Sequence, residues 1–171
     1  MFSSENFSSR LKELKDLRNI STRELALKLD VSTQTVGHWQ TGYRTPPIEK
    51  IYAIADFFNV SLDYLVGRSE FVSSPISTDF QVHDTLQLGH CQEISEYNNE
   101  IFAKRFKELR KKNHLSILDL EDKIGVSMST INHWESNLRS PSIKKIFKLA
   151  EYFNVSVDYL LGRTDNPNIN H

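Results

Sequence analysis

The most constraining feature of this 171-residue sequence is an internal repeat. When residues 7–68 are aligned with residues 102–163, no gap is needed and 28 of the 62 positions are identical. The identities are clustered, as where FFNVSLDYLVGR at 57–68 meets YFNVSVDYLLGR at 152–163. Such a chain holds two copies of one small fold, each near the lower size at which a domain folds alone.

Each repeat has the apolar spacing of helices and no alternation typical of strands. Phe7, Leu11 and Leu14 recur at i, i+4 and i+7, on one side of a first helix. Serines that can cap helix N-termini open a second, a third and a fifth helix, and a proline precedes the fourth. These residues are Ser21, Ser32, Ser61 and Pro46 in the first repeat, and Ser116, Ser127, Ser156 and Pro141 in the second. The third helix is expected to end near Gly42 and Asn137, the residue types best suited to a left-handed C-terminal position. The sequence therefore predicts an all-α fold with five short helices in each repeat.

The connection between the second and third predicted helices is very short, at LDVS in the first repeat and IGVS in the second. A turn this short makes the helices cross steeply and leaves the later one projecting. Around it stand Leu25-Ala26, Asp30-Val31-Ser32, Val36, Trp39 and Gly42-Tyr43-Arg44-Thr45-Pro46. This order of motifs resembles the Cro and lambda-repressor-like helix-turn-helix family, also called the XRE family, over about 62 residues of each repeat.

The resemblance implies a domain organisation and a partner. It predicts two tandem lambda-repressor-like domains at 1–69 and 101–164, an acidic linker at 70–100 and a tail at 165–171. Double-stranded DNA is the implied partner, and the implied function is that of a sequence-specific transcription regulator. We interpret it as a repressor, because occupancy of a promoter is enough to repress. The sequence contains no phosphate-cradling glycine loop or nucleophile elbow, so we expect neither an enzyme nor a cofactor.

By position in the family pattern, the third helix of each repeat would enter the major groove by its N-terminal end, where free backbone N–H groups favour phosphate. The candidates for contacts with base edges are Thr33, Gln34, Gly37 and His38, and Met128, Ser129, Asn132 and His133 in the second repeat. The candidates for phosphate contacts are Thr22, Arg23, Ser32, Thr41, Tyr43 and Arg44, with Ser127, Ser136 and Arg139. Gln34 and Asn132 have the amide that pairs with adenine in bidentate fashion, whereas Met128 could only contact a thymine methyl.

Several of these positions also have structural interpretations. The serines at 32 and 127 would cap a helix in either case, and the histidines at 38 and 133 could be ordinary surface residues. Arg44 and Arg139 could brace the loop that follows the third helix instead of contacting phosphate. The lysines at 144, 145 and 148 could contact DNA, or could only form a solvated helix face. Buried core positions, rather than contacts, are expected for Val36, Trp39, Ile131 and Trp134.

The second repeat departs from the pattern where the first follows it. Glu121 stands where the first repeat has Ala26, and burying that carboxylate unpaired would cost several kcal/mol, so it must escape or be paired. Ile117 replaces Thr22, and the predicted helix is acidic. In the family an acid at the position of Glu135 pairs with a base on the first helix, so the resemblance implies that Arg110 partners Glu135, whereas Lys15 of the first repeat has only the neutral Gln40. The second repeat could therefore bind DNA. In the alternative, the chain is a regulator or an antitoxin-like protein in which the first repeat binds DNA and the second repeat or the linker mediates dimerisation or binds a protein partner.

The formal net charge of −1 hides an uneven distribution of charge. Residues 7–68 hold 9 basic and 7 acidic side chains, and residues 102–163 hold 12 and 7, whereas residues 69–101 hold 6 acids and no Lys or Arg. The alternation FQVHDTLQL within that connector could form a small hairpin, although a flexible tether is equally compatible. A tether of about 33 residues reaches roughly 30 Å, which would let one chain occupy two half-sites one DNA turn apart.

The remaining features of the sequence limit other classes of function. His83, His90 and Cys91 do not provide four ligands at the spacing of a zinc site, so no metal is expected. No apolar run approaches the roughly 18 residues needed to span a membrane, and the start is not a secretory signal. With a single cysteine, the chain is expected to be cytoplasmic.

Overall fold

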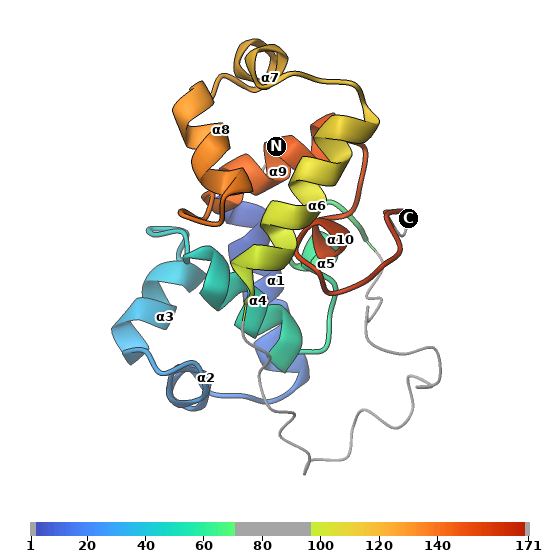
Figure 1. Cartoon of the computed structure of the whole chain (residues 1–171). Coiled ribbons are helices and arrows are strands. Elements are labelled where there is room, and N and C mark those ends of the chain that lie inside the picture. Colours follow the sequence, from blue (N-terminus) through green and yellow to red (C-terminus); the bar gives the residue numbers. More distant parts are fainter. Residues whose placement is uncertain (1–2, 71–96, 170–171) are drawn as a thin grey trace. The chain divides into compact units, whose positions relative to one another are not determined.

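A computed structural model of the chain describes residues 3–70 and 97–169. The two repeats fall in separate compact units, which are described here one at a time. All regular structure in the described residues is helical, with five helices in each unit, which confirms the predicted fold class (Figure 1). None of the described helices combines the length and the apolar character that crossing a membrane requires.

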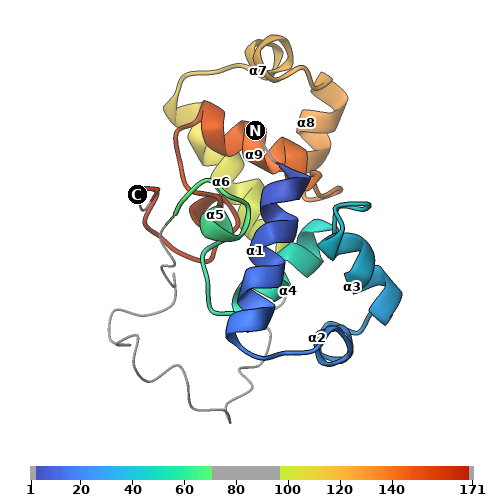
Figure 2. The ribbon, with the colours of Figure 1, turned by 180° about the vertical axis from the view of Figure 1, so that it is seen from behind.

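The first unit contains α1 (Ser4–Leu17), α2 (Thr22–Lys28), α3 (Thr33–Gln40), α4 (Ile48–Phe57) and α5 (Leu62–Leu65). The second helix packs on the third, and α1 contacts both α3 and α5. In Figures 1 and 2, α2 and α3 lie at the outer edge of their unit, joined by a short turn. The geometry that the sequence predicts for a helix-turn-helix is thus present in the first repeat.

The second unit repeats this order with α6 (Asn99–Lys112), α7 (Ile117–Ile124), α8 (Met128–Glu135), α9 (Ile143–Tyr152) and α10 (Val157–Leu160). The pairs α7 with α8 and α6 with α8 pack together, as the corresponding helices of the first unit do. The first of these helices begins at Asn99, capped by Asn98, and so extends into the range that the sequence assigns to the linker.

Helix starts are fixed by the predicted serine caps. Ser32 Oγ accepts a hydrogen bond from the amide of Thr35 at 3.1 Å, and Ser127 caps α8 in the same way. Capping boxes, in which the cap and the third helical residue bond reciprocally, open α2 at Ser21 and α7 at Ser116. A cap of this kind stabilises a helix by about 1 kcal/mol, so these serines define where each helix begins.

The turns rely on residues that accept a left-handed backbone. Asp30 has φ of 50° in the turn between α2 and α3, where Gly125 has φ of 64° in the second repeat. After the third helix of each repeat, Gly42 and Asn137 have φ of 71° and 58°. Glycine adopts this region without strain, and asparagine and aspartate tolerate it better than other residues that have a side chain. The predicted chain reversals at these positions are therefore confirmed.

Each unit is held together by its own small apolar core. Val36 and Trp39 of α3 are 0% and 3% exposed, and Ile131 and Trp134 of α8 have the same values, as predicted. In the second unit the rings of Phe106 and Trp134 pack edge to face with centroids 6.0 Å apart. Burying each such side chain contributes about 1.5–3 kcal/mol. Because one side of α3 and of α8 is committed to the core, the opposite side is left at the surface.

Candidate nucleic-acid interface

The outward side of α3 carries the residues predicted to contact bases. Thr33 and Gln34 are exposed, and His38 is half-buried one turn later. Gly37 lies between them, and a Cβ placed there would meet no heavy atom within 4 Å. The backbone amides of Thr33 and Gln34 have no hydrogen-bond partner in the described part of the chain. The first turn of α3 therefore offers both side chains and free N–H groups to a ligand.

An open hollow adjoins this helix and brings several predicted residues together. Its lining residues are Gln34, His38, Thr41, Gly42, Tyr43 and Arg44. The rings of His38 and Tyr43 contact each other with centroids 5.0 Å apart and an angle of 53° between their planes. The side chain of Tyr43 is 73% exposed. Residues predicted to read bases and residues predicted to contact phosphate thus share one concave surface.

The two arginines after the third helices do not brace the loop. Arg44 and Arg139 are exposed, and neither side chain makes a hydrogen bond or ion pair with any residue described in the structure. Arg23, at the start of α2, is likewise exposed and makes no such contact. These guanidinium groups remain available to an external anion such as a phosphate.

Other predicted phosphate contacts already have partners within the fold. The Thr22 hydroxyl accepts from Lys15 Nζ at 2.7 Å and lies 3.2 Å from Gln40 Oε1, to which it donates. The Thr41 hydroxyl donates to the carbonyls of Gly37 and His38, at 3.1 and 3.2 Å. Lys15, which the family pattern places opposite the neutral Gln40, is buried and reaches Gln40 only through the Thr22 hydroxyl, a link that the sequence did not reveal.

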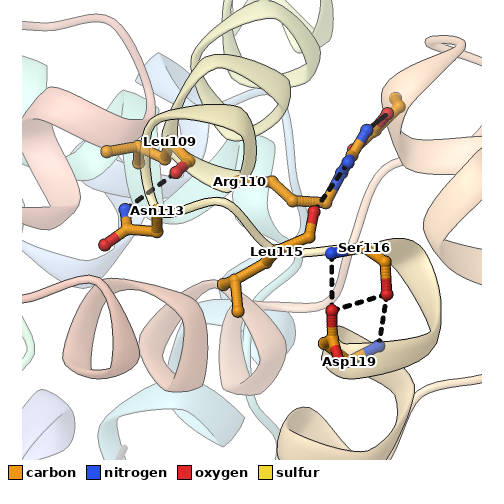
Figure 3. Close-up of polar contacts among 7 residues, drawn as sticks. Leu109, Arg110, Asn113, Leu115, Ser116 and Asp119 are labelled. Atoms are coloured by element: carbon orange, nitrogen blue, oxygen red, sulfur yellow. Dashed lines mark hydrogen bonds and ion pairs between the residues drawn. The ribbon is translucent and has the colours of Figure 1, made fainter.

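A charged pair replaces that relay in the second repeat. Arg110 donates from Nε to Glu135 Oε1 at 2.5 Å and from Nη2 to Oε2 at 2.9 Å, which confirms the predicted pairing. Figure 3 shows Arg110 also reaching the carbonyl of Leu115, next to the capping box between Ser116 and Asp119. The hydrogen bonds with Glu135 raise the pKa of the Arg110 guanidinium above its ordinary value.

The second repeat presents a more apolar surface at the corresponding positions. Met128 is 45% exposed, and Ser129 and Asn132 are also exposed, with His133 half-buried. Leu118 and Leu138, which are 57% and 74% exposed, stand where the first repeat has Arg23 and Tyr43. Sequence reasoning had not singled out these two leucines, although the alignment of the repeats contains the signal. Ser127, Ser136 and Arg139, for which the sequence predicts phosphate contacts, are exposed.

The side chain of Glu121 lies against the start of α8 and is not buried in the core. The side chain is half-buried, and its Oε1 accepts a hydrogen bond from the amide of Met128 at 3.4 Å. It forms no ion pair with the residues that the structure describes. The carboxylate has therefore escaped from the core, as the sequence required, and stands on the N-terminus of α8.

Two of the three lysines considered for DNA contact have structural partners. Lys148 Nζ donates to the carbonyl of Ile124 at 2.7 Å, and Lys145 Nζ donates to that of Gly125 at 3.3 Å. In the first repeat Lys50 donates to the carbonyl of Leu29 at 2.5 Å. Positive charge at a helix C-terminus is stabilising, so these lysines serve to hold α2 and α7. Lys144 is exposed.

The residues considered for a zinc site, His83, His90 and Cys91, lie outside the described residues, as does the segment FQVHDTLQL. Within the described ranges, no group of three or more His, Cys, Asp or Glu side chains could hold a metal ion.

Comparison with known proteins matches both repeats to one family. The helix-turn-helix family model matches residues 11–65 and 106–160. The chain is 37% identical over 67 residues to the HTH-type transcriptional regulator YobD of Bacillus subtilis, covering 39% of this chain and 60% of that protein. It is 31% identical over 126 residues to the regulator ImmR of the same organism, covering 63% and 98%. AnsR, another regulator of that organism, is 41% identical over 59 residues, covering 34% and 51%. No solved structure matches the chain.

These matches cover different shares of the relatives. The chain spans less than two thirds of YobD and about half of AnsR, but nearly the whole of ImmR. All three relatives are named as HTH-type transcriptional regulators, in agreement with the class of function that the sequence predicts.

Proposed function

Because the chain belongs to the helix-turn-helix family, we propose that it is a DNA-binding transcription regulator whose first repeat reads a double-stranded sequence with α3. The observation that carries this proposal is the open first turn of α3, with exposed Thr33 and Gln34 side chains and unpartnered backbone amides. A helix of this width fits the major groove, and its N-terminus attracts phosphate. The relatives named as transcriptional regulators support the same function.

Reading and anchoring would be performed by different side chains. Gln34 would donate to N7 and accept from N6 of an adenine, which requires an exposed amide on the outward side of the helix. The exposed guanidinium groups of Arg23 and Arg44 would bind phosphates and fix the register of the helix without reading sequence. Thr22 and Thr41 would act indirectly, since their hydroxyls hold the surface in shape.

The regulator would act as a repressor, because a protein of this size can block a promoter by occupancy alone. A regulator of this kind works in the compartment that holds the DNA, which in bacteria is the cytoplasm.

A comparison of two substitutions tests the assignment of reader and anchor. Gln34→Ala should weaken binding to the preferred site by about 1–3 kcal/mol and relax discrimination at one base pair, with little effect on random DNA. Arg23→Ala should weaken binding to specific and random duplexes alike and reduce the slope of log K against log salt by about 0.9. Fluorescence anisotropy of the full chain over a range of salt concentrations measures both effects.

Lys12→Ala is the matched control, because it removes an exposed cation of the same repeat from outside the proposed surface. It should change neither affinity nor salt slope appreciably. If the full chain shows no preference for any duplex selected from a random pool at low salt, the proposed function is wrong.

A second candidate function concerns the second repeat, which would mediate dimerisation or bind a protein partner while the first repeat binds DNA. The exposed Leu118, Met128 and Leu138 favour it, since apolar side chains are unsuited to phosphate. In the competing arrangement, α8 reads a second half-site through Asn132. Footprinting with the intact chain distinguishes the two arrangements. One protected half-site per chain supports a second repeat that binds protein, and two half-sites support a second repeat that reads DNA.

A further inference from the structure

On the basis of the proposed function, we infer that Glu121 closes the start of α8 to DNA phosphate, so that only the first repeat of each chain takes a phosphate at the start of its recognition helix. Glu121 would be a specificity-determining residue that selects which of two similar folds engages DNA. The inference rests on contacts that differ between the repeats although their helices correspond one to one.

The first difference is the occupancy of the helix start. In the second repeat the Met128 amide donates to the Glu121 carboxylate at 3.4 Å. In the first repeat Ala26 stands at the corresponding position, 2% exposed, and it has no group that could reach the amide of Thr33. The backbone N–H of Thr33 therefore remains free among the described residues, whereas that of Met128 already holds an anion.

The second difference is the charge around the helix start. No Lys or Arg of the described residues pairs with Glu121, so its negative charge is not neutralised. Leu118 occupies the position of Arg23, which removes the cation that would help to hold a phosphate. A phosphate at this place would meet the unpaired carboxylate of Glu121 without the cation that Arg23 supplies at the corresponding position of the first repeat, and repulsion disfavours it.

The third difference concerns the groups beside the helix start. Thr22, whose hydroxyl takes part in the relay with Lys15 and Gln40, is replaced by the half-buried Ile117. A polar surface at this position is thus lost independently of Glu121. The three differences point the same way, and none arises from the fold itself, because α7 and α8 pack on each other as α2 and α3 do.

The test follows backbone amide signals by NMR in the full chain while a random-sequence duplex is added at low salt. In the unmodified chain the signals of Thr33 and Gln34 should shift, and those of Met128 and Ser129 should not. In Glu121→Ala, which places the residue of the first repeat in the second, the signals of Met128 and Ser129 should shift as well. Affinity for random duplex should rise about fivefold, and the salt slope should steepen by about 0.9.

Asp122→Ala is the matched control, because it removes the same charge from the same helix at an exposed side chain that is not bonded to α8. It should leave the Met128 and Ser129 signals unmoved. Shifts of these signals in the unmodified chain, their absence in Glu121→Ala, or equal shifts in Asp122→Ala would each overturn the inference. If instead Thr33 and Gln34 do not shift in the unmodified chain, it is the proposed reading by α3 that fails.

Discussion

The two repeats hold their recognition helices with different chemistry at the same positions. In the first, Lys15, Thr22 and Gln40 form a relay with one charge, at distances of 2.7 and 3.2 Å. In the second, Arg110 and Glu135 form a bidentate ion pair. Because the ion pair is complete in itself, the neighbouring position can be the apolar Ile117. The polar contact that joins the first and third helices therefore differs between the repeats, and the residue at the start of the second helix differs with it.

A further difference lies at the joint between the first and third helices. The buried Ser8 hydroxyl of the first repeat lies 2.8 Å from the Trp39 carbonyl and 2.7 Å from that of Ser4, a bifurcated contact that ties α1 to the end of α3. Ala103 stands at this position in the second repeat, where the stacked pair Phe102 and Phe106 packs against the helix instead. One repeat relies more on neutral hydrogen bonds, and the other on an ion pair and aromatic packing.

The largest expected effect is on the ion pair. Glu135→Ala should lower the free energy of unfolding of the second repeat by about 3 kcal/mol, because it leaves the Arg110 guanidinium, which is only 14% exposed, without a counter-charge. Gln40→Ala should cost the first repeat only about 1 kcal/mol, since it removes one hydrogen bond between uncharged groups.

Urea unfolding measures these changes separately, because each repeat contains one tryptophan. In a Trp39→Phe background the fluorescence of Trp134 reports the second repeat, and the converse background reports the first. Each variant is compared with its own single-tryptophan parent. If both substitutions lower the free energy of unfolding equally, the relay and the ion pair contribute the same stability and the predicted contrast is wrong.

An intermediate effect is expected at the turn before the recognition helix, where the repeats share a backbone but not a residue. Gly125→Ala should destabilise the second repeat by about 1 kcal/mol, because φ is 64° and a Cβ there would meet nothing within 4 Å, so that only backbone strain acts. Asp30→Gly, at φ of 50°, should stabilise the first repeat by up to about 1 kcal/mol. Thermal unfolding with the same tryptophan reporters measures both, and changes of the same sign would refute the explanation by strain.

The smallest effect is the pH dependence of the two capping boxes. Hydrogen bonds from Ser21 lower the pKa of Glu24, and hydrogen bonds from Ser116 lower the pKa of Asp119. A carboxyl group with a lowered pKa contributes stability above its ordinary pKa and loses it as the pH falls through the lowered value. Each repeat should therefore lose a small contribution to its stability as the pH falls through the lowered pKa of its own capping carboxyl group.

Glu24→Gln and Asp119→Asn are the controls, since an amide oxygen keeps the bond to the cap amide but does not titrate at acid pH. Each substitution should reduce the loss of stability at acid pH in its own repeat only. If the loss of stability at acid pH is unchanged in both variants, other carboxyl groups set the pH dependence.

Much of the architecture could be predicted because it depends on short stretches of sequence. A serine before a helix, Gly42 or Asn137 after one, and the spacing of Val36 and Trp39 each act over a few residues. The pairing of Arg110 with Glu135 could be predicted because the family pattern relates these positions. The part of Thr22 in linking Lys15 to Gln40 could not, since a chain of three polar groups from three helices depends on how the helices pack.

By itself, the sequence determined that two all-helical repeats exist, where their helices begin and end, and which side of α3 and α8 faces solvent. Only the tertiary structure decided that Glu121 leaves the core for the amide of Met128 and that Arg23, Arg44 and Arg139 keep their charges free. The reason is physical: caps and turns are satisfied by adjacent backbone groups, whereas a long charged side chain takes whichever partner the packing of another helix brings within reach.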